Sequence, residues 1–278
     1  MAIEGFGYWS GEDVRIEFRP APANTGITFV RVDLPTPWRI RAELSHRIDV
    51  PRRTVLSSGG VAVEMVEHIL AACMGLGLDN CEIWADRAEM PGCDGSALPF
   101  VEALSRAGLV DQEAVRPRQV ITKVVRVGDD RAWIEARPPD HYGLSLVYGL
   151  DYGHGSAIGC QNIELAVTPE SFECRLAPAR TFLLQDEADW LRNRGLGRRV
   201  SYSDVLVFGE RGPIGNTLRF PDECVRHKAL DFLGDLALAG RDFVGRFVAY
   251  RSGHRLNAEL VRALLADDST TRLLRKSA

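Results

Sequence analysis

Three polar residues stand four positions apart in one otherwise apolar segment. The stretch Val-Arg-His-Lys-Ala-Leu-Asp-Phe-Leu-Gly-Asp, residues 225–235, places His227, Asp231 and Asp235 on a single face if it is helical. Charged groups are costly in apolar surroundings unless they pair with one another or bind a metal. A histidine and an aspartate one turn apart also form common surface ion pairs, but the apolar flanking residues argue against a solvated pair. The spacing therefore indicates a candidate metal site.

A second histidine stands in a similar context in the first part of the chain. Val66 and Glu67 precede His68, and Gly75 follows seven residues after that histidine, just as a valine and a glycine flank His227. This echo predicts a duplicated unit whose two helices bring the histidines together in a cleft. Two histidines and one aspartate with an open position are typical of a catalytic zinc site. The same set also binds iron in non-haem oxygenases, so the residues alone leave the metal open.

Three further residues could take part in chemistry at such a centre. Glu67 could act as a general base on metal-bound water, although it could also be a solvated charge at a helix start. His254, expected in a turn after a strand, could be a general acid whose ring Asp235 holds and whose pKa Asp235 raises. Otherwise it is an ordinary surface histidine. Lys228 would point away from a cation and toward an anion such as phosphate, or would simply be exposed.

Composition narrows the class of protein. The chain has 278 residues and a formal net charge of −4, which argues against bulk binding of nucleic acid. Its longest apolar run is too short to span a membrane, and its first residues lack the pattern of a secretory signal. The six cysteines form no C-x-x-C pair, so we expect reduced thiols in a cytoplasmic protein.

The hydrophobic periodicity predicts an α+β protein with two similar halves. Strands are expected at 14–18, 27–32, 54–56, 61–63, 80–85, 120–127, 132–136, 144–150, 161–167, 205–208 and 243–250, and helices at 64–74, 96–107, 185–194, 225–235 and 257–266. A proline between two arginines, Arg116-Pro117-Arg118, suits a linker. It would divide an N-terminal domain, residues 1–116, from a C-terminal domain, residues 117–278.

Taken together, several short stretches resemble one known enzyme family. They are Arg19-Pro-Ala-Pro-Ala-Asn-Thr-Gly26, Val66-Glu-His68 with Gly75-Leu-Gly-Leu-Asp-Asn80, Met90-Pro91 with Asp94-Gly-Ser-Ala97 and Pro99-Phe100, Ala179-Arg-Thr-Phe182, Arg226-His-Lys-Ala-Leu-Asp231 with Gly234-Asp235, and Ser252-Gly-His254 with Leu256-Asn257. In this order they resemble the UDP-3-O-acyl-N-acetylglucosamine deacetylases, zinc enzymes of lipid A biosynthesis. The resemblance covers nearly the whole chain.

The resemblance implies a fold and a set of roles. It implies two domains of similar β-α-α-β sandwich topology, each with a small insert, packed helix to helix. The implied roles are zinc ligation by His68, His227 and Asp231, general base catalysis by Glu67, protonation of the leaving amine by His254 oriented by Asp235, oxyanion binding by Thr181, diphosphate binding by Lys228, and a place along the substrate groove for Phe182. The insert around residues 185–202 would wall a passage for the acyl chain.

Two departures from the family pattern touch substrate positioning. Trp9 replaces a cleft histidine, and Arg199-Val200 replaces two glycines. The expected substrate is thus a small molecule, an acylated UDP-amino sugar, with zinc as cofactor. A zinc deacetylase of another N-acetylated sugar and a non-catalytic homologue that binds a sugar nucleotide or acyl chain remain alternatives. The sequence leaves the acyl length and the oligomeric state open, and a monomer is compatible with it.

Overall fold

Two sheets with the same strand order form the framework of the molecule. The computed structural model describes residues 1–266 and the backbone of residues 271–274. The first sheet has the order β1 (Ala2–Phe6), β2 (Asp13–Pro20), β8 (Cys81–Ala85), β3 (Ile27–Arg31) and β4 (Trp38–Arg41). In it β3 and β8 run parallel, whereas the other neighbours are antiparallel.

The second sheet repeats this arrangement with later strands. Its main path has the order β10 (Val125–Gly128), β11 (Trp133–Arg137), β17 (Asp242–Tyr250), β12 (Leu144–Asp151) and β13 (Cys160–Val167). Here β12 and β17 are the parallel pair, in the place that β3 and β8 take in the first sheet. The sheet is extended by β9 (Arg118–Ile121), which pairs with β17, and by β18 (Thr271–Leu274), which pairs with β9.

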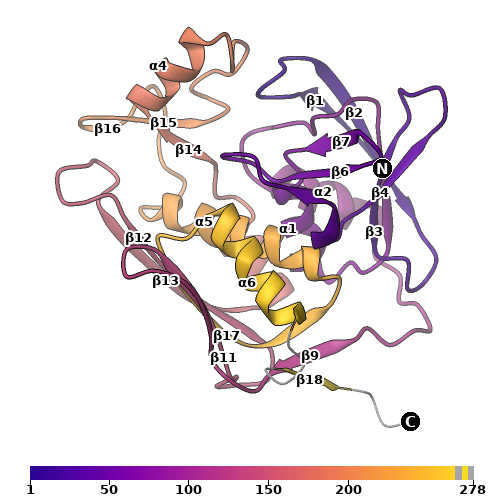
Figure 1. Cartoon of the computed structure of the whole chain (residues 1–278). Coiled ribbons are helices and arrows are strands. Elements are labelled where there is room, and N and C mark those ends of the chain that lie inside the picture. Colours follow the sequence, from indigo (N-terminus) through magenta and orange to yellow (C-terminus); the bar gives the residue numbers. More distant parts are fainter. Residues whose placement is uncertain (267–270, 275–278) are drawn as a thin grey trace.

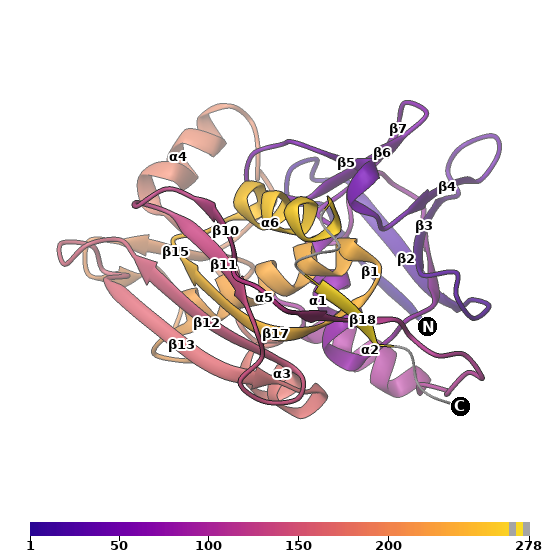
Figure 2. The same cartoon turned by 60° about the horizontal axis from the view of Figure 1, so that its bottom comes forward.

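Helices fill the space between the sheets, as Figures 1 and 2 show. The central pair is α1 (Glu67–Leu76) and α5 (Glu223–Leu236), which pack against each other. Around them lie α2 (Leu98–Ala107), α3 (Pro169–Arg175), α6 (His254–Ala266) and the short 3₁₀ helices η1 (Leu44–His46) and η2 (Ala237–Ala239). The strands alternate accordingly, so that in β2 the side chains of Val14, Ile16 and Phe18 are buried and the residues between them face outward.

The contact between α1 and α5 depends on a glycine. A Cβ atom at Gly234 would collide with the backbone carbonyl oxygen of Glu67, so the helices approach closely only because this side chain is absent. Both helices are buried on most of their surface, including the polar His68, His227 and Asp231. The core therefore contains polar groups at the point where the two helices meet.

Each sheet is accompanied by a small three-stranded sheet. The first is β5 (Arg47–Ile48), β6 (Val55–Ser58) and β7 (Val61–Glu64), and the second is β14 (Phe182–Leu184), β15 (Leu206–Gly209) and β16 (Gly212–Pro213). The predicted hairpin turn between β6 and β7 is present, with Gly59 and Gly60 at φ 57° and 82°. Helix α4 (Gln185–Asn193) projects beside β14 and β15 (Figure 1).

Three predicted elements need correction. The first central helix begins at Glu67 instead of residue 64, because Glu64 pairs with Val55 in the hairpin and Met65 turns the chain at φ 57°. The predicted strand at 120–127 is two strands, because β9 pairs with β17 while β10 pairs with β11. The last helix starts at His254 instead of residue 257, so His254 opens α6 and does not lie in a loop.

Two other predictions concern the cysteines and the membrane. All six cysteines are free thiols, and Cys73, Cys81 and Cys224 are buried in the apolar core. Among the described residues no helix is both long enough and apolar enough to cross a membrane.

Candidate metal centre

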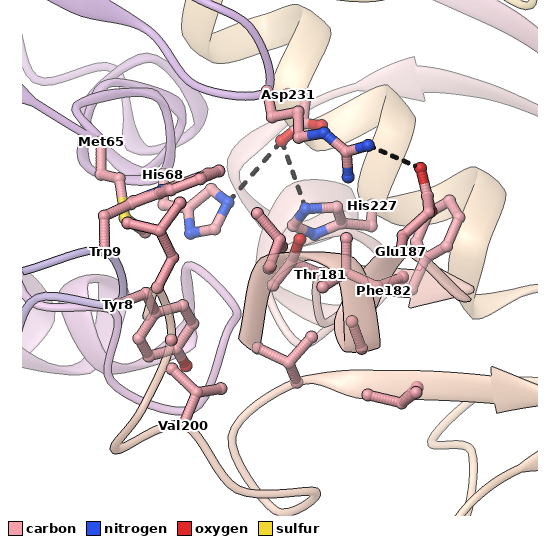
Figure 3. A pocket seen from close by; sticks show the side chains of 18 of the residues that line it. Tyr8, Trp9, Met65, His68, Thr181, Phe182, Glu187, Val200, His227 and Asp231 are labelled. Atoms are coloured by element: carbon pink, nitrogen blue, oxygen red, sulfur yellow. Dashed lines mark hydrogen bonds and ion pairs between the residues drawn. The ribbon is translucent and has the colours of Figure 1, made fainter. Parts of the chain in front are cut away.

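The three proposed metal ligands meet where α1 contacts α5. His68 lies in the first turn of α1, whereas His227 and Asp231 lie one turn apart on α5. The Nε2 atoms of His68 and His227 are 3.6 Å and 3.3 Å from the same oxygen, Oδ1 of Asp231 (Figure 3). The two imidazole rings stand edge to face, with centroids 5.0 Å apart. Residues about 160 positions apart in sequence thus converge on one point.

Neighbouring groups give His227 and Asp231 the protonation that a metal ligand needs. Nδ1 of His227 donates to the carbonyl oxygen of Ala179 at 3.0 Å, which leaves Nε2 with a free lone pair. Burial lowers the pKa of His227 to about 3, although Asp231 opposes the shift. Burial would raise the pKa of Asp231, but His227 and Lys228 outweigh it and hold that pKa well below its usual range. The ring is neutral and the carboxylate is charged.

A buried oxygen atom without a hydrogen-bond partner indicates whether a metal fits between these residues. Oδ1 of Asp231 is buried and makes no hydrogen bond with any described residue, which is costly for a charged acceptor. The ligand atoms of His68, His227 and Asp231 all lie within 4.8 Å of one another. Neutral imidazole nitrogens and one carboxylate oxygen are a donor set that suits zinc. A divalent cation at this point would satisfy the orphaned oxygen and both nitrogens.

A buried hydrogen-bond network adjoins the ligands. Oε2 of Glu67 accepts from the backbone N–H of Thr54 at 3.0 Å, and the hydroxyl of Thr54 donates to Oδ1 of Asp235 at 2.6 Å. The other oxygen of Asp235 accepts from Nδ1 of His254 and from the side-chain amide of Asn257, both at 2.8 Å. The structure thus brings Glu67, Asp235 and His254 together, as the sequence predicts.

The network also fixes the protonation of its two ends. Burial raises the pKa of Glu67, and His254 and His68 offset only part of this shift. Burial favours neutral His254, but the charge of Asp235 and its hydrogen bond prevail and raise the pKa of His254 to about 9. At neutral pH the site therefore combines a carboxylate of increased basicity with a protonated imidazole.

Lys228 lies differently from its predicted position. Its Nζ atom donates to Oδ2 of Asp231 at 2.8 Å, so it does not point away from the metal ligands. The reason is that Asp231 is three residues further along α5 and carries a negative charge, which a lysine on the same face can reach. Burial would lower the pKa of Lys228, but Asp231 raises it, so the ammonium group stays charged.

Thr181 and Phe182 line the cavity next to the ligands (Figure 3). The ring of Phe182 stands edge to face with that of His227, with centroids 6.4 Å apart. The chain at this point is held by Arg180, which is buried and binds Glu223 through its backbone N–H and its guanidinium group. This clamp fixes the Ala179 carbonyl that orients His227.

The cavity is lined by both polar and apolar side chains. Its volume is about 400 Å³, and its polar lining includes the metal ligands, Glu67 and His254. The remaining wall includes apolar side chains from α4 and the segment that follows it: Ala188, Leu191, Leu196, Val200, Val205 and Val207. Of the sequence departures, Trp9 and Val200 line this cavity (Figure 3), whereas the guanidinium group of Arg199 donates to the carbonyl oxygen of Gly11 and to Asp13. Such a shape suits a molecule with one polar reacting group and one apolar tail.

The family model described as "LpxC: UDP-3-O-acyl N-acetylglycosamine deacetylase" matches residues 1–266. The chain belongs to this deacetylase family. Three similar proteins bear the name UDP-3-O-acyl-N-acetylglucosamine deacetylase. The one from Solibacter usitatus is 37% identical, over 97% of this chain and 90% of its own length. Those from Myxococcus xanthus and Thermosynechococcus vestitus are 38% and 40% identical, over 96% and 94% of this chain and 85% and 90% of their own lengths.

Membership of the deacetylase family and the buried His68, His227 and Asp231 cluster together identify the metal centre as a zinc site. Beyond the predicted residues, the structure adds Thr54 and Asn257, which hydrogen-bond to Asp235, and Arg180, which clamps the Ala179 segment. Asn257 and Arg180 lie inside stretches that resemble the deacetylase family, and this was the signal available for them. Thr54 has no local signal, because its partner Asp235 is far away in sequence.

Proposed function

We propose that this chain removes the acetyl group from the 2-amino group of UDP-3-O-acyl-N-acetylglucosamine and releases acetate. The observation that carries the proposal is the buried cluster of His68, His227 and Asp231, which lines a cavity together with several apolar side chains. The deacetylase family supports the substrate class and the place of the reaction in lipid A biosynthesis. The enzyme is a zinc-dependent amidohydrolase.

The chemistry is hydrolysis of an amide. His68, His227 and Asp231 would hold zinc, which would act as a Lewis acid toward the acetyl carbonyl and would lower the pKa of water. Glu67 accepts the proton of the water whose oxygen attacks the carbonyl carbon, and its raised pKa makes it a better base. The hydroxyl of Thr181 hydrogen-bonds the developing oxyanion. The C–N bond then breaks as protonated His254, oriented by Asp235, gives its proton to the nitrogen of the leaving amine.

Other side chains bind the parts of the substrate that do not react. Lys228 contributes its positive charge to the diphosphate, since its side chain is partly exposed and lines the cavity, and its ammonium group has donors beyond the one given to Asp231. Phe182 lies along the groove beside the ligands. The apolar wall formed by α4 and residues 196–207 encloses the acyl chain, whose burial supplies binding energy.

The chain is divided into two domains, residues 1–116 and 117–278, of similar β-α-α-β sandwich topology. Support comes from the shared strand order of the two sheets, the parallel pair at the same place in each, and one small three-stranded insert beside each sheet. Glu67 and His68 belong to the first domain, and His227, Asp231 and His254 to the second. The site lies between the domains and is built from one chain, which is compatible with a monomer. The free thiols support a cytoplasmic location.

One alternative substrate class has a specific observation behind it. Trp9 and Val200, which replace residues of the family pattern, both line the cavity and narrow the room for substrate. They favour a different acyl length or a different N-acetylated sugar with the same zinc chemistry. A non-catalytic homologue is disfavoured because the three ligands and Glu67 are all present.

The deciding experiment measures acetate released from UDP-3-O-acyl-N-acetylglucosamine, with and without a metal chelator. We expect release that the chelator abolishes and that added zinc restores. UDP-N-acetylglucosamine and N-acetylglucosamine, which lack the acyl chain, serve as comparison substrates. Equal or faster turnover of either comparison substrate would favour the alternative, and absence of acetate release from all three would refute the proposed function.

A further inference from the structure

We propose that Thr54 is a positioning residue that holds Glu67 and His254 in a fixed relation across the metal site. This inference rests on the proposed function, because it assigns Thr54 to the reaction of the same site. Thr54 carries no charge, and its side chain and N–H bond Glu67, Asp235 and His254 instead of the metal ligands. Its role follows from where its two donors point.

Thr54 uses its backbone and its side chain on different partners. Its N–H donates to Oε2 of Glu67 at 3.0 Å, and its hydroxyl donates to Oδ1 of Asp235 at 2.6 Å. The hydroxyl oxygen is also 3.3 Å from Nδ1 of His254. The residue is completely buried. One residue therefore joins the carboxylate proposed as the base, through its backbone N–H, to the carboxylate that orients the proposed acid, through its hydroxyl.

The donor count makes the hydroxyl necessary to Asp235. Its Oδ2 atom receives two donors, from His254 and Asn257, whereas among the described residues Thr54 supplies the sole hydrogen bond to Oδ1. Removing that hydroxyl would leave a buried carboxylate oxygen unpaired. The Asp235 carboxylate could then rotate, and its hydrogen bond would no longer hold the ring of His254 in one orientation.

Thr54 is itself held rigidly. It directly precedes β6, and its carbonyl oxygen accepts from the backbone N–H of Val66 at 3.4 Å, just before α1 begins. The Met65 turn, with φ 57°, brings the chain back to make this contact. The hairpin of the first half thus extends one hydroxyl to Asp235 on α5 of the second half. We infer that this bond sets the distance between base and acid, in addition to the contact between α1 and α5.

The test compares Thr54→Val, which keeps the shape and the backbone N–H but removes the hydroxyl, with Thr54→Ser, which keeps the hydroxyl. We expect Thr54→Val to lower kcat by roughly 10- to 100-fold with KM changed less than about threefold. This is less than the roughly 10²- to 10⁴-fold contribution of an acid–base group, because His254 is still present and only its orientation is lost. Thr54→Ser should stay within about threefold of the wild type. Equal kcat in Thr54→Val and the wild type would overturn the proposal.

A double-mutant cycle shows whether Thr54 acts through Asp235. In an Asp235→Ala background, Thr54→Val should change kcat by less than about twofold, because the partner of the hydroxyl is already gone. If Thr54→Val lowers kcat by the same factor in both backgrounds, the positioning role through Asp235 is wrong. Zinc content and the far-UV circular dichroism spectrum of each variant exclude loss of metal or fold as the cause.

A second readout does not depend on turnover. The Nδ1–H proton of His254 is observable by NMR below pH 7, where its neighbours Asp235, Asp231 and Glu67 favour the charged ring. Its exchange with solvent should be at least about tenfold faster in Thr54→Val than in wild type and Thr54→Ser. Unchanged exchange would overturn the inference even if acetate release is confirmed, and faster exchange would support it even if acetate release is not. If Thr54→Val does not fold, Thr54→Ala replaces it in all three measurements.

Discussion

A single hydrogen bond decides which nitrogen of His227 is available to a metal. The carbonyl oxygen of Ala179 can only accept, so Nδ1 must carry the proton and Nε2 must face Asp231. Arg180 and Glu223 hold that carbonyl in place through three hydrogen bonds. The tautomer of this ligand is thus set by backbone geometry, whereas burial keeps the ring neutral.

The role proposed for Glu67 predicts that a substitution there lowers turnover without lowering zinc binding. Glu67→Gln keeps an oxygen that can accept from Thr54 but loses the basic carboxylate, so zinc should still bind. We expect kcat to fall by about 10²- to 10⁴-fold, the usual contribution of a general base. Metal analysis and acetate release measured on the same preparation check this. A variant with full zinc and full turnover would remove Glu67 from the mechanism.

The pair of His254 and Asp235 predicts a pH dependence of stability. The pKa of His254 is about 9 in the folded protein and about 6.5 in an unfolded chain. The charged pair therefore stabilises the fold fully below about pH 6.5, and this contribution is lost as pH rises through 9. We expect the melting temperature of wild type to exceed that of His254→Gln at pH 6, with a difference that shrinks by pH 9.5.

This comparison is made on zinc-free protein, because a bound cation would add its own charge to the site. A difference between the two proteins that does not change between pH 6 and pH 9.5 would contradict the assignment of the raised pKa to His254.

At the scale of elements, the glycine at the crossing of α1 and α5 predicts a sensitive position. In Gly234→Ala the new methyl group would meet the carbonyl oxygen of Glu67, and the helices would have to separate. Overpacking of this kind costs about 1–3 kcal/mol, and the separation would also pull His68 away from His227. We expect a lower melting temperature and a zinc affinity reduced at least about tenfold.

Gly155→Ala is the matched control, because a Cβ atom at Gly155 meets nothing within 4 Å. Competition with a chelator measures the zinc affinity of both variants. Unchanged affinity in Gly234→Ala would show that the ligands tolerate movement of the two helices.

The position of helix α4 in the cavity wall predicts that a substitution there changes KM according to the length of the acyl chain. Ala188 is buried and lines the apolar part of the cavity, so Ala188→Leu would fill space needed by a long chain. We expect KM to rise at least about tenfold for a long-chain substrate, since a few buried methylene groups are worth this much, and less than about threefold for a short-chain one. Asp189→Leu adds similar bulk on the exposed side of α4 and should leave both values unchanged. Equal effects of Ala188→Leu on both substrates would contradict an acyl passage here.

At the scale of the whole molecule, the metal is expected to stabilise the fold, because its ligands come from helices of both halves. Zinc at about 1,000 times its dissociation constant would contribute about 4 kcal/mol. For a chain of this size, zinc removal should lower the melting temperature by roughly 8–16 °C. Calorimetry before and after treatment with a chelator measures the change, and added zinc should reverse it. An unchanged melting temperature would show that the two halves hold together without the metal.

The sequence predicts much of this arrangement, for reasons that differ between residues. Helical spacing places His227, Asp231 and Asp235 on one face because four residues make about one turn. The repeated context of His68 signals a second, similar helix. By contrast, the start of α1 depends on Glu64 pairing with Val55, and this strand contact overrides the helical pattern. Thr54 escapes prediction altogether, because its hydrogen bond spans 181 residues and leaves no local pattern.

The wide separation of the two histidines also governs how the protein is made. During synthesis the ribosome adds about 5–20 residues per second, so His68 emerges roughly 10–30 seconds before His227. Throughout that interval the nascent chain carries Glu67 and its apolar neighbours without the helix that will cover them. Metal binding by all three ligands must therefore come late in synthesis. A truncated product that ends before α5 would expose the apolar surface of α1 to chaperones and proteases.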